Sequence, residues 1–232
     1  MINGLSEMEK YKVIRPLFGD YKLDAFDMPV IKKTDLQVLD WEKLKATGIQ
    51  NASSKTADKN TLVFMFNYDK KLQRLWNSPL KYIGLFQQFA AICTPDFSLY
   101  PSMNSNEIRH NVFKSRWLGA TWQSYDGVYV LPTIGWASPD TYDICFSGIE
   151  FGSVVVISTI GCERNRRSFL EGFYEMRSRI NPPLIVLLGD IIDGMAGTFL
   201  TFSYTDTFLM RGEKKQLCFE GIQKVFTISE VV

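Results

Sequence analysis

Histidine and paired cysteines are scarce in this chain. The 232 residues contain one histidine, His110, and four widely separated cysteines, Cys93, Cys145, Cys162 and Cys218. No C-x-x-C spacing of a zinc site occurs, and a Ser–His–Asp relay would have a single possible base. With 46% hydrophobic residues the chain can build a core without a disulfide framework, so we expect reduced thiols. These features disfavour a zinc centre and a triad hydrolase.

Long apolar runs are also absent. The longest, SVVVISTI and LIVLLGDII, fall short of the roughly 20 residues that a membrane span needs. The start, MINGLSEMEKYKVIRPLF, lacks the apolar segment of a signal peptide. The sequence therefore predicts a cytoplasmic protein with no membrane association.

Charge of one sign does not dominate. Twenty-six Lys and Arg against 25 Asp and Glu give a formal net charge of +1, so no global field would recruit duplex nucleic acid. Trp117, Trp122 and Trp136 lie near a basic helix and could stack the bases of single-stranded nucleic acid. Such residues also fill cores, and both interpretations stay open.

The chain is predicted to have three parts. Residues 1–60 form an N-terminal extension ending in a polar loop at 45–60, KATGIQNASSKTADKN; the alternative is a long surface loop within one domain. Residues 61–195 form the core domain. Residues 196–232 form an antiparallel β addition packed on the core, with a charged turn at RGEKKQ, residues 211–216.

The core alternates between strand and helix patterns. Predicted strands occupy residues 61–67, 90–98, 128–136, 153–159 and 182–190, and helices lie within 68–89, 104–127 and 166–180. The segment 137–152 is too short and glycine-rich to predict a helix. The pattern indicates an α/β fold with a mainly parallel sheet and right-handed helical crossovers, either an open sheet or a partial barrel.

Parallel sheets place their ligand sites at the carboxyl ends of the strands. The alternative for each polar residue found there is a turn former or a helix cap. The candidates selected by position are Asn67, Asp69, Asp96, Ser98, Trp136, Ser158, Gly161 and Asp190.

The helix within 104–127 can be analysed face by face. Asn104 and Glu107 have the spacing of a capping box, which predicts a start near Ser105. His110 should lie with Lys114 and Trp117, nearly opposite the apolar face, in a partly exposed position. Asn111 is expected at the edge of the apolar face, which comprises Ile108, Val112, Ser115, Leu118, Gly119 and Trp122.

Two ligand chemistries fit these residues. Asp69, Asp96 and Asp190, if gathered at one sheet edge, could hold Mg²⁺ or Mn²⁺ and assist phosphoryl chemistry. In STIGCERNRRSF, Gly161 precedes a helix whose positive end, with Arg164 nearby, could receive a phosphate. The alternative is a solvated basic turn, because neither a P-loop nor a dinucleotide fingerprint is present.

A series of motifs carries a resemblance to a known family. PDFSLY, Asn111, Arg116, LG, VLPTIGW, YDICFSGI, VVVISTIG and FLEGF, over about residues 61–190, resemble an uncharacterised domain-of-unknown-function family of bacteria, phages and mobile elements. The resemblance implies a phage or prophage setting, hence the host cytosol, and no established reaction. Its polar positions are Asp96, Ser98, Tyr100, Asn111, Arg116, Trp136, Ser147, Ser158 and Gly161.

Two functional hypotheses follow. The first is a protein that binds a phosphate-bearing ligand, such as a nucleotide or the end of a single-stranded nucleic acid, with or without turnover. The second is a non-enzymatic viral interaction protein that binds a host or phage protein. Oligomeric state is not predicted. The ligand-binding set is Asp96, Ser98, Tyr100, Asn111, Arg116, Trp136, Ser158, Gly161 and Arg164.

Overall fold

The computed structural model describes residues 6–17, 21–202 and 224–228. The α-helices are α1 (Glu7–Val13), α2 (Asp69–Asn77), α3 (Ile83–Phe86), α4 (Ser105–Gln123), α5 (Tyr142–Cys145) and α6 (Arg166–Ile180). The 3-10 helices are η1 (Leu36–Val38), η2 (Pro139–Thr141) and η3 (Glu163–Asn165). The strands are β1 (Lys45–Gly48), β2 (Thr61–Phe64), β3 (Ala91–Cys93), β4 (Val130–Leu131), β5 (Val155–Ser158), β6 (Ile185–Leu188), β7 (Gly197–Phe202) and β8 (Lys224–Ile228).

The strands pair in the order in which they occur along the chain. β1, β2, β3 and β4 form a parallel sheet, and β5, β6 and β7 form a second parallel set with β8 antiparallel at its edge. A parallel bridge between Thr133 and Val156 joins the two sheets. There Ile134 N donates to Val156 O at 2.8 Å, and Val156 N donates to Pro132 O at 2.9 Å. The two sheets therefore form one continuous surface.

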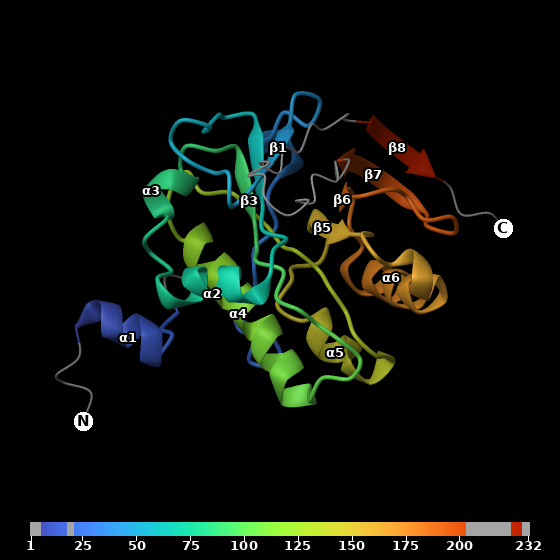
Figure 1. Ribbon diagram of the computed structural model, residues 1–232, viewed down its shortest axis with the longest axis horizontal. Helices are drawn as coiled ribbons and strands as arrows, with labels where there is room; N and C mark the ends of the chain where they lie inside the picture. The colour runs from blue at the N-terminus through green and yellow to red at the C-terminus, as the bar shows by residue number, and fades with distance from the viewer. Residues whose placement is uncertain (1–5, 18–20, 203–223, 229–232) are drawn as a thin grey trace, which may run out of the picture.

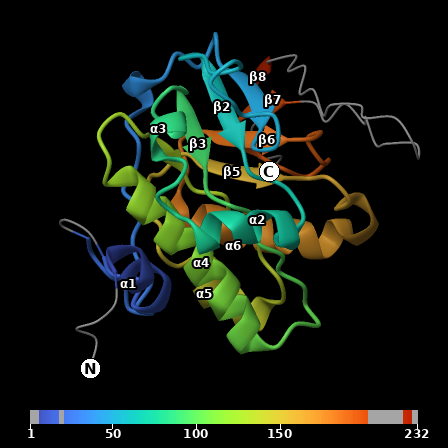
Figure 2. The ribbon, with the colours of Figure 1, turned by 60° about the vertical axis from the view of Figure 1, so that its left-hand side comes forward.

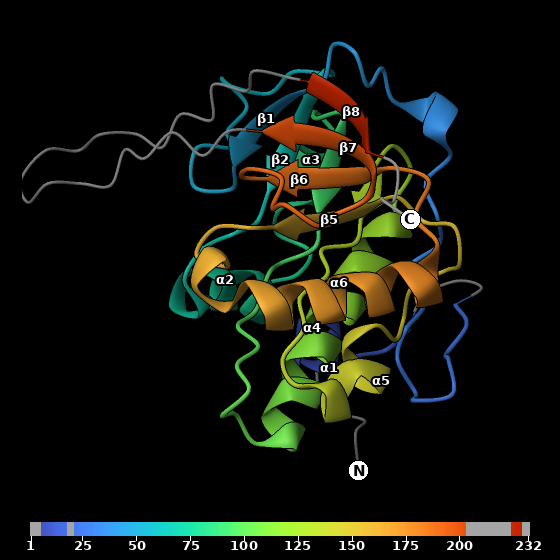
Figure 3. The ribbon, with the colours of Figure 1, turned by 90° about the vertical axis from the view of Figure 1, so that its right-hand side faces the viewer.

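This surface is curved around a core of its own. Buried side chains from β2, β3, β6 and β7 pack together on its inner side, although these strands belong to both sheets. Phe64 of β2 and Phe202 of β7 meet there edge to face, with ring centroids 5.4 Å apart. Figure 3 shows β5 to β8 side by side, with β1 and β2 beyond them. The fold is thus the predicted α/β class in its barrel-like form.

Helices cover the outer side of the curved sheet. Val63, Ile92 and Val130 point outward into a cluster with Leu118 and Trp122 of α4, which α2 and α3 complete. A second outer cluster joins β5, β6 and β7 to α5 and α6. Figures 1 and 2 show α2, α3 and α4 grouped against the first sheet and α6 alongside the second. Because side chains alternate along a strand, each buried strand contributes to both an inner and an outer core.

Two segments differ from the sequence-based expectation. Lys45–Gly48 is strand β1, paired in register with Thr61–Phe64, rather than the beginning of a polar loop. The alternation of exposed Lys45 and buried Ala46 suits an edge strand, which a count of polar residues does not detect. β7 runs parallel to β6 rather than antiparallel, whereas the expected antiparallel pair is formed by β7 and β8. The charged turn expected at residues 211–216 lies outside the described residues.

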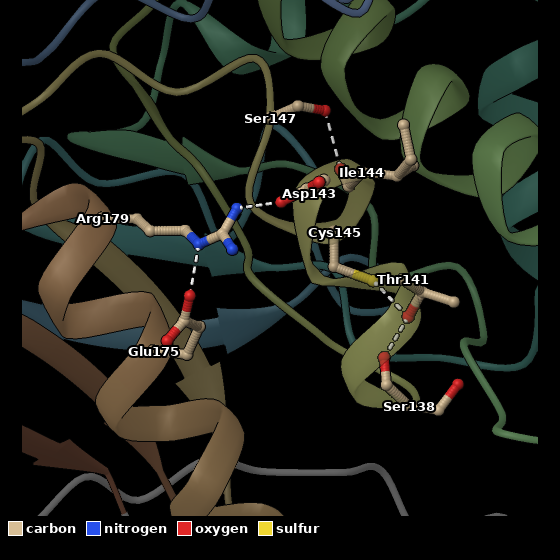
Figure 4. A network of polar contacts seen from close by, with 8 residues as sticks. All are labelled: Ser138, Thr141, Asp143, Ile144, Cys145, Ser147, Glu175 and Arg179. Atoms are coloured by element: carbon tan, nitrogen blue, oxygen red, sulfur yellow. Dashed lines mark hydrogen bonds and ion pairs between the residues drawn. The ribbon is translucent and has the colours of Figure 1, made fainter.

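The segment for which no helix was predicted contains η2 and α5. Side-chain hydrogen bonds support its turns: Thr141 Oγ1 donates to Ser138 O at 2.6 Å, and Ser147 Oγ donates to Ile144 O at 2.7 Å. Arg179 of α6 donates to Asp143 of α5 at 2.6 Å (Figure 4). The short helix is therefore held by local hydrogen bonds, by the contact with α6 and by burial of Tyr142 and Cys145 in the second outer cluster.

Within the described part of the chain, no helix is both long enough and apolar enough to cross a bilayer.

Candidate functional site

A cavity of about 130 Å³, the inner cavity, lies at the carboxyl ends of the central strands. Asp96 follows β3, Trp136 follows β4, and Ser158 ends β5, so three of the residues selected by position converge there. The sheet brings them together because the carboxyl ends of parallel strands meet at one edge. The full lining is Phe66, Asp96, Ile134, Gly135, Trp136, Ser158, Cys162 and Phe169.

Asp96 is the charged group of the inner cavity. Its backbone N donates to Met65 O at 3.2 Å, which fixes the loop after β3 against the loop after β2. Its carboxyl group accepts no hydrogen bond from any described residue. Burial, reinforced by the negative charge of Asp69, raises the pKa of Asp96 to about 7. The carboxyl group is therefore a half-buried acceptor that faces a space large enough for a ligand group.

Trp136 forms an aromatic wall of the cavity. Its ring lies 5.1 Å from that of Phe169 and 6.0 Å from that of Phe146, centroid to centroid. Gly172 of α6 lies directly behind it, where a Cβ atom would come within 2.8 Å of Trp136 Cε2 and closer still to Nε1. The glycine therefore makes the room that the indole needs, and Trp136 and Phe169, whose ring planes are inclined at 37°, form an apolar aromatic wall near Asp96.

The other polar side chains of the inner cavity are already engaged. Ser158 Oγ donates to Leu188 O at 3.2 Å and accepts from Ile160 N at 3.2 Å. Cys162 Sγ donates to Ser158 O at 3.7 Å, and burial together with the charge of Asp96 raises the pKa of this thiol. Neither side chain contacts Asp96 as a donor. The cavity therefore keeps its strongest acceptor for a ligand.

Two further open hollows are lined by residues that follow β5 and β6. The outer depression, about 410 Å³, lies over the loops after β5 and β6 and is lined by Thr159, Ile160, Gly161, Glu163, Gly189, Asp190 and Ile192. Thr159 Oγ1 donates to Asp190 O at 2.8 Å and ties the two loops together, while Gly161 adopts a φ of +78°. The basic hollow, about 480 Å³, shares Glu163 with the outer depression and is lined further by Arg164, Asn165, Arg166, Arg167, Ser168 and Glu171.

Several predicted residues hold the loop after β3 instead of lining the cavity. Asp69 accepts from Ser98 N at 3.0 Å and from Ser98 Oγ at 3.1 Å. Asn111 of α4 donates to Ser98 O at 2.7 Å. Ser98 is thus held on both sides, and this hydrogen bonding fixes the position of Asp96 two residues earlier. Tyr100 is 58% exposed, on the outside of the same loop.

Arg116 serves the fold from a buried position behind Asp96. It is 2% exposed and donates to three backbone carbonyls: Ser147 O at 2.9 Å, Thr133 O at 3.1 Å and Cys145 O at 2.9 Å. Burial lowers the pKa of its guanidinium to about 10. Asp96, Asn111 and Arg116 border a void of only about 10 Å³, too small for a ligand. We therefore assign Arg116 and Asn111 to positioning the loops around the site.

The three aspartates considered for a metal ion are not gathered at one point. Asp69 lies close enough to Asp96 to raise its pKa, but Asp190 lines the outer depression instead. Across residues 6–17, 21–202 and 224–228, no group of three or more His, Cys, Asp or Glu side chains could hold a metal ion.

Helix α4 begins at Ser105 as predicted, with the Asn104 side chain accepting from Asn106 N at 2.9 Å. His110 is exposed, as expected, and its ring meets that of Trp76 edge to face, with centroids 5.9 Å apart. The prediction that Trp117 and Lys114 share this exposure was wrong, because both are buried.

The N-terminal segment covers this face of α4. Trp117 Nε1 donates to Arg15 O at 2.9 Å and to Pro16 O at 3.2 Å, and the Arg15 guanidinium lies 3.5 Å from the centre of the Trp76 ring. Figure 2 shows α1 beside α4. Trp122 is also fully buried and donates to Pro79 O at 2.7 Å. Trp117 and Trp122 are therefore core residues rather than stacking platforms, whereas Trp136 borders a cavity.

Five residues of the site escaped sequence analysis: Phe66, Ile134, Gly135, Cys162 and Phe169. Phe66 and Gly135 stand just beyond strand ends, so the positional rule that selected Asp96 could have included them. Phe169 offered no such signal, because its aromatic side chain fits the apolar face of α6 equally well.

The geometry defines a class of protein: a barrel-like α/β domain with an acidic, aromatic-walled cavity at the carboxyl ends of its parallel strands. The chain belongs to the family described as "Domain of unknown function (DUF4417)", whose model matches residues 21–205. The match extends beyond the residues that suggested the resemblance and includes β1 and β7. Residues 21–60 are accordingly part of the family domain rather than of an extension peculiar to this chain.

Two phage proteins are similar to this chain. The "Gene 1 protein" of Mycobacterium phage L5 is 34% identical over 170 residues, covering 72% of each chain. The "Gene 1 protein" of Mycobacterium phage D29 is 40% identical over 124 residues, covering 52% of this chain and 46% of the relative. No solved structure matches the chain. These relatives confirm a phage-type protein of unknown function.

Proposed function

We propose that this protein binds a nucleotide, with the base in the inner cavity and the phosphate toward the basic hollow. The observation that carries the proposal is the Asp96 carboxyl group, which has no protein donor among the described residues and faces a cavity walled by Trp136 and Phe169. An aromatic surface beside a hydrogen-bonding group is the usual way in which proteins hold a base.

The dimensions support a base in the inner cavity and the rest of the nucleotide outside it. Typical ligand pockets measure about 300–1,000 Å³, whereas the inner cavity is about 130 Å³. Only a single ring system fits such a space. We place the sugar outside the inner cavity, over the loop after β5 that lines the outer depression.

The basic hollow supports a place for the phosphate. It surrounds the first turn of α6, a 15-residue helix whose N-terminal end carries a partial positive charge. Arg164 and Arg167 are exposed there and form no ion pair with other described residues. Arg166, in contrast, is paired with Asp193. The two remaining arginines are the donors that we assign to the phosphate.

Metal-assisted phosphoryl chemistry and the binding of a nucleic-acid end remain predictions of the sequence. Both are tested with the same protein by adding Mg²⁺ or Mn²⁺ and by offering single-stranded oligonucleotides that carry a 5′-phosphate. Release of phosphate or shortening of the oligonucleotide would establish turnover.

The second candidate function, binding of a host or phage protein, is favoured by one surface feature. Val13, Ile14 and Leu17, near the N-terminus, are exposed by 71%, 46% and 39%. Clustered apolar residues of this kind mark interaction sites in soluble proteins. Replacing the three with serine should abolish capture of such a partner and leave nucleotide binding unchanged.

The proposal is tested by isothermal titration calorimetry of the full chain with nucleoside monophosphates. We expect saturable binding that is lost in Trp136→Ala, weakened and changed in its preference among bases in Asp96→Asn, and kept in Asp126→Asn, an equivalent charge change at an exposed loop position. The double variant Arg164→Ala, Arg167→Ala should weaken the binding of nucleoside monophosphates more than the binding of nucleosides. Absence of binding by every nucleotide, in protein shown to be folded by circular dichroism, would refute the proposal.

A further inference from the structure

The hydrogen-bonding groups of the inner cavity are arranged unevenly, and this arrangement selects among bases. Asp96 presents two carboxyl oxygens, and no described residue donates to either. Gly135 lies beside this group: a Cβ atom built on Gly135 would stand 3.6 Å from Asp96 Oδ1. The backbone N–H groups of Gly135 and Trp136 form no hydrogen bond within the described residues either. The groups without a partner are therefore two carboxyl acceptors and, on two other lining residues, two backbone donors.

This pattern matches one of the common bases. The pairing edge of guanine presents an acceptor, O6, followed by two donors, N1–H and the N2 amino group. Adenine and cytosine place a ring acceptor beside their amino donor, and uracil places a donor between two acceptors. A carboxylate would repel the ring acceptor of adenine or cytosine, whereas guanine offers both of its oxygens a donor.

Resting on the proposed function, we propose that the protein selects guanine nucleotides, with N1–H and the N2 amino group donating to the Asp96 carboxylate and O6 accepting from the N–H of Gly135 or Trp136. The base lies against Trp136 and Phe169, which line the same cavity. The backbone contact is independent of side-chain identity. Asp96 is therefore the residue that determines the choice of base.

The surroundings of Asp96 couple this recognition to pH. Three titratable groups face it: Asp69 from α2 raises its pKa, Cys162 lines the same cavity, and Arg116 of α4 borders the void behind it. In the free protein the pKa of Asp96 is about 7. Two donated hydrogen bonds stabilise the carboxylate, so binding of guanine lowers this pKa and releases a proton. Guanine binding must therefore weaken as the pH falls below 7.

Adenine and cytosine give the opposite dependence. Their ring acceptor requires a proton on the Asp96 carboxyl group, so these bases bind the neutral acid. Their binding therefore strengthens as the pH falls. The ratio of GMP to AMP affinity removes the common contribution of the phosphate group. We expect this ratio to rise between pH 6 and pH 8.

The experiment is calorimetric titration of the full chain with GMP, IMP, AMP, CMP and XMP at pH 6, 7 and 8. GMP should bind best, and IMP, which lacks the N2 amino group, should bind about tenfold more weakly, because a hydrogen bond to a charged group contributes at least that much. Asp96→Asn should weaken the binding of GMP by about tenfold or more and should favour the binding of XMP. In XMP an oxygen, O2, replaces the N2 amino group of GMP, and the asparagine amide can donate to it. Asp126→Asn should keep the selectivity of the unmodified protein.

The outcomes separate the two proposals. Preference for GMP that grows with pH and changes to XMP in Asp96→Asn supports guanine selection. Binding of nucleotides without a preference for GMP, or with a GMP to AMP ratio that grows toward low pH, overturns guanine selection and leaves nucleotide binding standing. Absence of binding by all five nucleotides overturns both.

Discussion

Replacing Gly172 with alanine sets helix propensity against packing at the cavity wall. In the interior of a helix, alanine is favoured over glycine by about 0.8–1.0 kcal/mol. At Gly172, however, the new Cβ would lie within 2.8 Å of Trp136 Cε2 and closer to two other atoms of the indole. The indole cannot retreat freely because Phe169 and Phe146 pack against it. Overpacking of this kind costs about 1–3 kcal/mol, so packing should prevail.

Because the new Cβ would meet three atoms of the indole, we take overpacking at the upper part of its range, about 2–3 kcal/mol. After subtracting about 1 kcal/mol for helix propensity, we expect Gly172→Ala to destabilise the fold by about 1–2 kcal/mol in urea denaturation followed by circular dichroism. It should also weaken nucleotide binding, because a displaced Trp136 narrows the inner cavity. The matched control is Gly84→Ala in α3, where the added Cβ meets nothing within 4 Å. That variant should keep or slightly increase stability. A Gly172→Ala protein as stable as the unmodified chain would refute the packing argument.

Three further substitutions test other parts of the structure. Arg116→Leu removes the donor to three buried carbonyls and should lower the free energy of unfolding, measured by urea denaturation, by about 3 kcal/mol or more. A loss below about 1 kcal/mol would show that the loops do not need the guanidinium. Because the pKa of Asp96 is raised from 3.8 to about 7 in the folded protein, the folded protein binds more protons than the unfolded chain between these values, and its stability should fall as pH rises through this window. Asp96→Asn should flatten this pH dependence of stability by an amount on the order of 1–4 kcal/mol between pH 4 and pH 8. An unchanged slope in the variant would contradict the raised pKa of Asp96. Trp117→Phe loses the hydrogen bonds to Arg15 and Pro16, so it should lower the free energy of unfolding by about 1–3 kcal/mol and accelerate proteolysis near residue 15. His110→Ala, the control on the same helix, should do neither.

The sequence predicted the strands that are buried on both faces, because runs such as SVVVIST carry a strong β-branched signal. It missed β1, whose polar residues suit the edge of a sheet, and α5, which depends on contacts such as that between Arg179 and Asp143. Both omissions have the same physical origin. Their stability comes from pairing and ion pairs with segments far along the chain, which local patterns do not record.

For the site, the rule on strand ends selected Asp96, Trp136 and Ser158 correctly as neighbours around one cavity. Asn111 and Arg116 were added by the resemblance to a family, and residue type alone did not reveal that they bond to backbone carbonyls, which any residue supplies. Nor could it place Trp117 in the core. The residues that bury Trp117 lie about a hundred positions earlier, in the N-terminal segment.

The pairing of strands in chain order has a consequence for synthesis of the protein. Each strand from β2 to β7 finds its partner in the strand that has already emerged, so the sheet can grow from one end as the chain leaves the ribosome. The inner cavity is completed late in this sequence, since Phe169 is its last contributor. A nascent chain stalled before α6 would therefore carry a nearly finished first sheet with Trp136 lacking its aromatic neighbour Phe169. Ligand binding to ribosome-bound chains of increasing length would report the moment at which the site closes.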